Sequence, residues 1–345
     1  MSAKKTALVV CPGRGTYNKA ELGYLMRHHS ERKDMLAAFE AERAGRSQVS
    51  LAELDGASRY SVATHTRGDN ASLLIHACAY GDFQAIDRDK YDIVGVTGNS
   101  MGWYIALACA GALSISDGGR LVNTMGTIMQ ENLVGGQIVY PLLDEDWQPV
   151  PGRREEIAEH MAAVNGKADC AVYISITLGG MLVLAGNTAG LDALLKRLPV
   201  IDRFPMTLAN HAAFHTELQK PNSARGFEAL PSDIFRQPDI PLIDGRGALW
   251  QPGVTDLGAL YQYTLGHQVS EAYNFTRAIE VGVREFAPEC IIVLGPGTTL
   301  GGAVAQSLTG IDWQRLASKN DFANRQSETP YLLAMGRDDQ RQLVV

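Results

Sequence analysis

Residues 91–113, YDIVGVTGNSMGWYIALACAGAL, decide the fold. The apolar run up to Gly98 predicts a buried strand, and the alanine-rich run that follows Gly102 predicts a helix. Between them lies a Gly-X-Ser-X-Gly motif with Ser100 at its centre. Glycines on both sides permit a tight strand-to-helix turn that lifts the serine above a sheet. At this point Ser100 is either a nucleophile or a small residue in a tight turn.

Strands and helices alternate on both sides of this stretch. Apolar runs at 6–11 and 290–294 predict further buried strands, and 73–86, 277–286 and 300–308 predict helices. Strands that alternate with helices indicate a parallel α/β sheet. We therefore predict a large α/β domain formed by residues 1–133 and 210–345. The polar tail from about residue 311 is expected to lie on the surface.

The middle of the chain has a different order of predicted strands and helices. From residue 134 the pattern reads strand, helix, two strands around Gly179 and Gly180, helix and strand. This β-α-β-β-α-β order is typical of a ferredoxin-like split unit. We place a small ferredoxin-like domain at residues 134–209, inserted into the large domain.

Composition excludes several classes of protein. The 345 residues are 46% hydrophobic and 20% charged, with a formal net charge of −7, so neither nucleic acid nor an anionic membrane is expected as a partner. No apolar run is long enough for a membrane span or a signal peptide, which predicts a cytoplasmic protein. Five scattered cysteines predict neither a disulfide framework nor a metal site; they are Cys11, Cys78, Cys109, Cys170 and Cys290.

A nucleophilic serine needs a general base and an oxyanion hole. The backbone N–H of Met101, at the start of the expected helix, is one candidate oxyanion donor. The candidate bases are His211 and His215, in LANHAAFHTEL, and His267. The other histidines fit structural positions better: His28 and His29 a solvated helix face, and His76 a core position.

Six blocks of sequence, in the same order, resemble the malonyl-CoA:acyl-carrier-protein transacylases and the acyltransferase domains of polyketide synthases. The blocks are CPGRGTY (11–17), GNSMGWY (98–104), RLVNTMGTIMQ (120–130), AAFHTEL (212–218), QVSEAYNFTRAIE (268–280) and LGPGTTLGG (294–302). The resemblance implies an α/β hydrolase-like large domain with an inserted ferredoxin-like domain. The distance of His215 from the C-terminus disfavours a true α/β-hydrolase.

The resemblance also implies the roles of individual residues. Ser100 would be the acyl nucleophile, His215 its base, and the backbone carbonyl of Gln268 the group that orients His215. The N–H groups of Met101 and Arg14 would form the oxyanion hole. The implied substrates are an acyl-CoA and the phosphopantetheine thiol of an acyl carrier protein, with no cofactor and no metal.

The chain departs from the family pattern around the expected acyl site. Met125 falls where the family has an arginine that pairs with the malonyl carboxylate, and a thioether cannot replace that guanidinium. Phe214, before the base, is expected to limit bulk at the acyl group. Other positions expected at the substrate also differ from the family: Arg14, Asn99, Trp103, Ser175 and Thr177. For Trp103 a position in the core is the alternative to one that caps the acyl pocket.

These departures leave several functions open. The sequence favours transfer of a neutral, short acyl group because Met125 offers no cation. The alternatives are a malonyl-specific transacylase that uses Arg14, an acyl-carrier-protein thioester hydrolase, and a pseudoenzyme that binds a carrier protein. A serine hydrolase of unrelated fold is a further alternative. The sequence does not specify the acyl group, fatty-acid or polyketide synthesis, or the oligomeric state.

Overall fold

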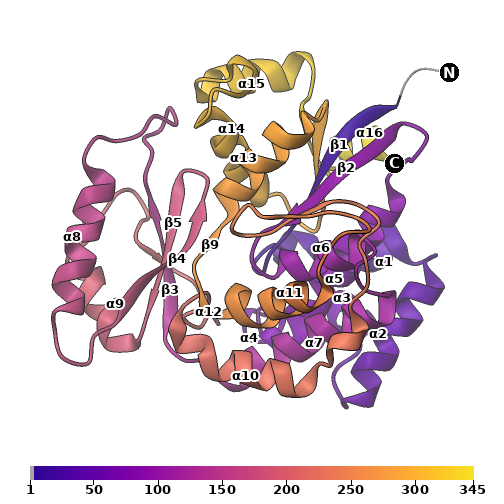
Figure 1. The fold of residues 1–345 in the computed structure, drawn as a ribbon, viewed down its shortest axis with the longest axis horizontal. Helices are drawn as coiled ribbons and strands as arrows, with labels where there is room; N and C mark the ends of the chain where they lie inside the picture. The colour runs from indigo at the N-terminus through magenta and orange to yellow at the C-terminus, as the bar shows by residue number, and fades with distance from the viewer. Residues whose placement is uncertain (1–3) are drawn as a thin grey trace.

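The computed structural model describes residues 4–345 and has an α/β fold with two sheets in that range (Figure 1). The larger sheet contains β1 (Lys5–Cys11), β2 (Tyr91–Gly98), β7 (Leu242–Ile243), β8 (Leu249–Trp250), β10 (Cys290–Val293) and β11 (Leu332–Ala334). The smaller sheet contains β3 (Gly136–Pro141), β4 (Val172–Leu178), β5 (Met181–Gly186), β6 (Met206–Thr207) and β9 (Tyr273–Asn274).

Helices surround both sheets. In the first part of the chain they are α1 (Tyr24–His29), α2 (Lys33–Gly45), α3 (Leu51–Asp55), α4 (Val62–His65), α5 (Gly68–Ala85), α6 (Gly102–Cys109) and α7 (Ile115–Glu131). The others are α8 (Arg153–Asn165), α9 (Thr188–Leu195), α10 (Lys220–Ala229), α11 (Leu257–Gln262), α12 (Gln268–Ser270), α13 (Phe275–Phe286), α14 (Leu300–Thr309), α15 (Lys319–Glu328) and α16 (Asp338–Val344).

The larger sheet has the order β11-β10-β1-β2-β7-β8, and its strands are parallel except for β8 at the edge. Helices α13 and α14 lie on one side of it, and α5 and α6 on the other (Figure 1). Leu8, Val9 and Val10 of the central strand β1 are fully buried, as expected for a parallel sheet covered on both faces. The predicted parallel α/β sheet is confirmed.

The smaller sheet has the order β6-β3-β5-β4-β9. From β3 to β6 the elements follow the order β-α-β-β-α-β, and α8 and α9 pack on one face of the sheet (Figure 1). The fifth strand, β9, comes from outside residues 134–209 and runs parallel to β4. Strand β4 also contains a β-bulge, since its pairing with β5 shifts between Ile174 and Ile176.

The prediction that the C-terminal tail lies on the surface is right for α15, which has no buried residue, and wrong for the segment that follows it. Strand β11 pairs in parallel with β10 and forms an edge of the larger sheet, and Leu332 and Leu333 are buried. Five apolar residues in a polar tail are too short a run to distinguish a buried strand from a loop.

His29 was also placed wrongly. It is 1% exposed, and its Nε2 lies 2.8 Å from Oδ1 of Asp82, which also pairs with Arg341 of α16. The charged neighbours of His29 suggest a solvated face, but α1 turns this side chain, like that of Tyr24, toward Asp82 of α5. His76 is fully buried, as predicted.

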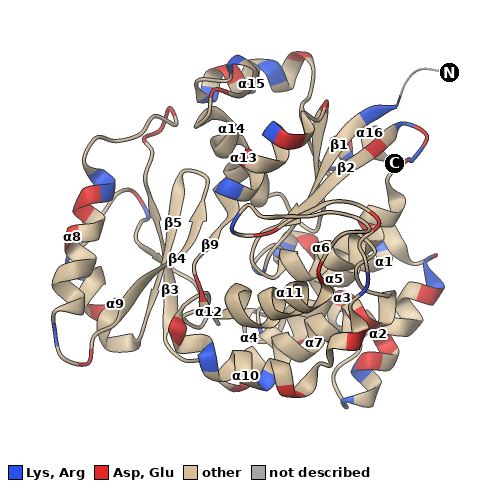
Figure 2. Ribbon diagram, viewed as in Figure 1, with Lys and Arg blue, Asp and Glu red and all other residues tan. Residues whose placement is uncertain are grey.

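Charged side chains of both signs lie on outer helices such as α2, α8 and α15 (Figure 2). Over residues 4–345, every helix is too short or too polar to span a bilayer. In the same range, acidic, histidine and cysteine side chains form no group of three that is suited to hold a metal ion.

Candidate active site

Ser100 lies in a sharp turn between β2 and α6. Its backbone φ is +57°, in the left-handed region that non-glycine residues rarely adopt. A Cβ on Gly98 would lie 2.2 Å from the carbonyl oxygen of Gly102, and one on Gly102 would lie 2.4 Å from the carbonyl oxygen of Cys11. Both glycines of the motif are therefore needed for the chain to pass this turn, which holds Ser100 above the sheet.

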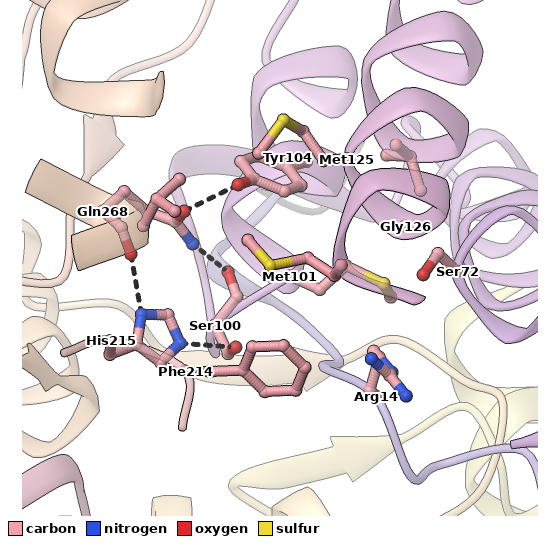
Figure 3. A pocket seen from close by; sticks show the side chains of 13 residues that line it. Arg14, Ser72, Ser100, Met101, Tyr104, Met125, Gly126, Phe214, His215 and Gln268 are labelled. Atoms are coloured by element: carbon pink, nitrogen blue, oxygen red, sulfur yellow. Dashed lines mark hydrogen bonds between the residues drawn. The ribbon is translucent and has the colours of Figure 1, made fainter. Parts of the chain in front are cut away.

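Ser100, a histidine and a backbone carbonyl form a hydrogen-bonded series. Oγ of Ser100 lies 2.7 Å from Nε2 of His215, and Nδ1 of His215 lies 2.7 Å from the carbonyl oxygen of Gln268 (Figure 3). A carbonyl oxygen only accepts, so Nδ1 carries the proton. The Nε2 lone pair then faces the serine hydroxyl, which is the arrangement that proton removal requires.

Gln268 contributes its side chain as well as its carbonyl. Its Nε2 donates to the carbonyl oxygen of Ser100 at 3.0 Å, and its Oε1 accepts from the hydroxyl of Tyr104 at 2.8 Å. Gln268 follows a π-helical turn, Tyr263–His267, and begins the short helix α12. Because α12 ends at Ser270, Gln268 belongs to a last helical turn, whose carbonyls lack helical partners, so its carbonyl is available to His215.

Two tyrosines that support this site were missed in the sequence. Tyr104 holds the side chain of Gln268, and Tyr273 donates its hydroxyl to the carbonyl oxygen of Gly98 at 2.5 Å. Both lie inside blocks that resemble the transacylase family. Their hydrogen bonds join segments more than 160 residues apart, and spacing alone does not reveal such pairs.

Burial lowers the pKa of His215 to about 4. This pKa already includes two smaller effects: the hydrogen bond to the carbonyl of Gln268 raises it, and the nearby His267 lowers it. His215 is 4% exposed, and burial disfavours its charged form. His215 is therefore neutral at physiological pH and able to accept a proton.

The pH dependence of acylation follows from this shift. Protonated His215 cannot accept the proton of Ser100, so kcat/KM for acylation should fall as the pH drops through about 4. An ordinary histidine would give this fall near pH 6.5. Single-turnover rates between pH 3 and 8, with the fold checked by circular dichroism at each pH, measure the midpoint. A midpoint near 6.5 would show that the base is not a buried imidazole.

A mainly apolar cavity of about 440 Å³, part of it open to solvent, begins at Ser100 (Figure 3). Its residues come chiefly from α5, α6, α7 and the segments around His215 and Gln268. They are Arg14, Ser72, Ser100, Met101, Tyr104, Val122, Met125, Gly126, Met129, Phe214, His215, Gln268 and Val269. Of the residues expected at the substrate, Met125 and Phe214 thus line the cavity beside the serine.

Arg14 is the one basic guanidinium among these lining residues. Its Nη2 donates to the carbonyl oxygens of Thr66 and Asn210, at 2.9 and 2.7 Å, and its guanidinium lies over the ring of Phe214. Burial lowers its pKa to about 10, against a smaller opposing effect of Asp69. Arg14 therefore stays charged at neutral pH, and no carboxylate of residues 4–345 forms a salt bridge with it.

A second cleft reaches Ser100 along the smaller sheet. The sheet contributes mostly apolar side chains: Val139, Ile176, Leu178, Met181, Val183 and Met206. The opposite wall includes Asn99 and Arg14. The cleft and the cavity share Arg14, Ser100 and Phe214. They therefore meet at the serine, and we refer to them together as the two channels.

Three expected substrate contacts are absent from both channels. Trp103 is fully buried, and its Nε1 donates to Oγ1 of Thr264, so it belongs to the core. Ser175 is also fully buried and bonds to the protein backbone. Thr177 lies between Ile176 and Leu178, whose side chains face the cleft, so its own side chain points to the other face of β4.

The other candidate bases do not contact Ser100. His211 lines the cleft, and its Nδ1 lies 2.7 Å from Oε1 of Gln137. His267 stacks on Tyr263 in the π-helical turn. Met101 stands immediately before α6 and Arg14 lies in the loop after β1, and both residues line the cavity together with Ser100.

No protein-family model matches this chain. A malonyl CoA-acyl carrier protein transacylase of Bacillus subtilis is 25% identical over 225 residues, which make up 63% of this chain and 67% of that protein. This similarity supports the resemblance that the six sequence blocks indicated.

Solved structures show the same fold. The malonyl-CoA:acyl carrier protein transacylase of Xanthomonas oryzae has a TM-score of 0.76 and 20% identity, over 99% of this chain and 98% of that one. A malonyl-transacylase in complex with a type II polyketide acyl-carrier protein has a TM-score of 0.70 and 18% identity, over 98% and 97% of the two chains. The predicted α/β fold class is confirmed.

Proposed function

We propose that this chain, which shares the fold of malonyl-CoA:acyl carrier protein transacylases, transfers an acyl group from coenzyme A to a carrier-protein thiol through an ester on Ser100. The observation that carries the proposal is the hydrogen-bonded series Ser100, His215 and the carbonyl of Gln268, placed where two channels meet. The sequence similarity to transacylases supports it.

The proposed reaction has two halves. Oγ of Ser100 attacks the thioester carbonyl while Nε2 of His215 takes its proton, and the C–S bond then breaks as His215 returns the proton to the departing thiol. In the second half Nε2 of His215 takes the proton of a phosphopantetheine thiol as its sulfur attacks the ester, the ester C–O bond breaks, and His215 returns the proton to Oγ of Ser100. No cofactor or metal is needed, because coenzyme A and phosphopantetheine belong to the substrates.

The oxyanion of each tetrahedral intermediate needs donors in fixed positions. We assign the N–H groups of Met101 and Arg14 to this role, as the resemblance implies. Met101 stands immediately before α6, where N–H groups lack helical partners and the helix dipole favours negative charge.

Met125 supports a neutral, short acyl group such as acetyl. It is 1% exposed and lies in the cavity with Met101, Val122 and Met129. A carboxylate buried against these side chains would lose its hydration without gaining a partner, at a cost of several kcal/mol. This wall of the cavity favours acetyl over malonyl.

Arg14 supports a second candidate, an acyl group that carries a carboxylate. Its charged guanidinium lines the same cavity, and Oγ of Ser72 there is buried without a partner among the described residues. Both groups can donate hydrogen bonds to a carboxylate. Hydrolysis of the acyl-enzyme by water remains a third candidate, since water and a thiol would use the same base.

Intact-mass spectrometry with acetyl-CoA, malonyl-CoA and longer acyl-CoAs tests the proposal. We expect a covalent adduct of the acyl mass on Ser100, and at least a tenfold higher kcat/KM for acetyl-CoA than for malonyl-CoA, which corresponds to about 1.4 kcal/mol. Preference for malonyl-CoA that is lost in Arg14→Gln would establish the second candidate. Release of free acid in the presence of carrier protein would establish hydrolysis, and no adduct with any acyl-CoA would contradict the proposal.

A further inference from the structure

His215 has a backbone conformation that the surrounding structure must hold. Its φ is +56°, in the left-handed region. Conformations of this kind cost free energy and persist where neighbouring contacts enforce them. The peptide group between Phe214 and His215 sets this angle, so whatever holds the carbonyl oxygen of Phe214 also directs the imidazole toward Ser100.

The group that holds this carbonyl is the hydroxyl of Ser175. It donates to the carbonyl oxygen of Phe214 at 2.8 Å and accepts from Nε2 of Gln137 at 2.6 Å. Oε1 of Gln137 in turn accepts from Nδ1 of His211 at 2.7 Å. Because Gln137 occupies an acceptor site of the hydroxyl and His211 fixes the amide orientation, the single proton of Ser175 points to Phe214.

The β-bulge in β4 is what brings Ser175 to this position. Ile174 pairs with Leu184 and Ile176 with Val183, so Ser175 is the extra residue between two paired neighbours. A bulge re-aims one side chain and is common next to active sites. Ser175 bonds to Gln137, which lines the cleft together with Ile176, so two adjacent residues of β4 face the same side of the sheet, which regular alternation would not allow.

We propose that Ser175 is a positioning residue, which holds the Phe214–His215 peptide so that the imidazole meets Ser100, with Gln137 and His211 fixing its hydroxyl. Ser175 does not contact the substrate, because it is fully buried and lines neither channel. This role differs from the substrate contact that the sequence predicted at the same position. The inference rests on the proposed acylation of Ser100 by His215.

Ser175→Ala tests the inference. The variant leaves the carbonyl of Phe214 without its donor, and we expect the acylation rate to fall about ten- to a hundredfold, as small misplacements of catalytic groups do. KM for the acyl donor should stay within about threefold of the wild-type value, since no substrate contact is removed. Ser175→Thr keeps the hydroxyl and should recover most of the rate.

Ser307→Ala is the matched control. Ser307 is equally buried, and its hydroxyl also donates to a backbone carbonyl, that of Ala303, at 2.8 Å. It lies in α14 and lines neither channel. Ser307→Ala removes a similar hydrogen bond and leaves the Phe214–His215 peptide unchanged. The acylation rate of this variant should therefore equal that of the wild type.

The acyl donor in this test is p-nitrophenyl acetate alongside acetyl-CoA. If the wild type reacts with p-nitrophenyl acetate but with no acyl-CoA, the proposed function is overturned. The acylation rates with this ester would still show whether Ser175 positions His215. A wild-type rate in Ser175→Ala, a loss confined to KM, or no recovery in Ser175→Thr would each overturn the inference. If Ser175→Ala does not fold, Gln137→Met decides: because Gln137 also lines the cleft, a lower rate at unchanged KM supports the inference, and an unchanged rate or a loss confined to KM overturns it.

Discussion

Replacing Ser100 by alanine should abolish the acyl-enzyme and lower the transfer rate about 10⁴- to 10⁶-fold, as loss of the nucleophile does in other serine enzymes. Oγ of Ser100 is the one atom that bonds covalently to the acyl group in the proposed reaction. Its hydrogen bond to His215, at 2.7 Å, places it within reach of the base. The measurement is intact mass after incubation with acetyl-CoA and malonyl-CoA, together with the rate of transfer to carrier protein.

The fold should survive this change. Ser100 is partly exposed in the cavity wall, and alanine removes a single oxygen without creating a hole in the core. An unchanged unfolding midpoint together with the missing adduct would assign the loss to chemistry. Transfer or hydrolysis near the wild-type rate in Ser100→Ala would rule out the acyl-serine mechanism.

Replacing His215 by alanine should lower the acylation rate about 10²- to 10⁴-fold, the range of a general base in a serine enzyme. Nε2 of His215 is the acceptor that faces Oγ of Ser100, and Nδ1 is tied to the carbonyl of Gln268. Without the imidazole the serine keeps its proton near neutral pH. Stopped-flow or quenched-flow acylation with p-nitrophenyl acetate measures the loss directly.

His160→Ala serves as the control for loss of a histidine elsewhere. His160 lies on α8, where its Nε2 is 3.7 Å from Oε1 of Glu156. The His160→Ala variant should therefore be acylated at the wild-type rate. His211→Ala and His267→Ala should lose less than His215→Ala, because neither histidine contacts Ser100. A larger loss at His211 or His267 would mean that the base has been assigned to the wrong residue.

Local features of the sequence predict the parts of the site that depend on local geometry. The apolar run of β2, the flanking Gly98 and Gly102, and the alanine-rich α6 together place Ser100 in its turn. The choice among His211, His215 and His267 needed the resemblance to the transacylases, since each follows a plausible loop. The structure brings His215 to Ser100, whereas His211 bonds to Gln137 and His267 stacks on Tyr263.

The surroundings of the site could not be predicted in the same way. Ser175 was expected at the substrate, but the bulge in β4 depends on how that strand pairs with β5, and a single strand does not reveal its register. For Trp103 the sequence allowed both the acyl pocket and the core, because the direction of its side chain depends on how α6 packs against Thr264 and Tyr263. Tertiary contacts decide both.

The position of β10 between β1 and β11 has a consequence for synthesis of the chain on the ribosome. Strand β1 is made first, yet one of its edges has no partner until Cys290–Val293 have been translated. At the usual 5–20 residues per second, the roughly 200 residues between β2 and β10 take about 10–40 s to make. During that time one edge of this apolar strand, which is buried in the complete fold, is accessible to chaperones. The smaller sheet, whose strands β3 to β6 follow one another closely, can form while the nascent chain still lacks its final strands.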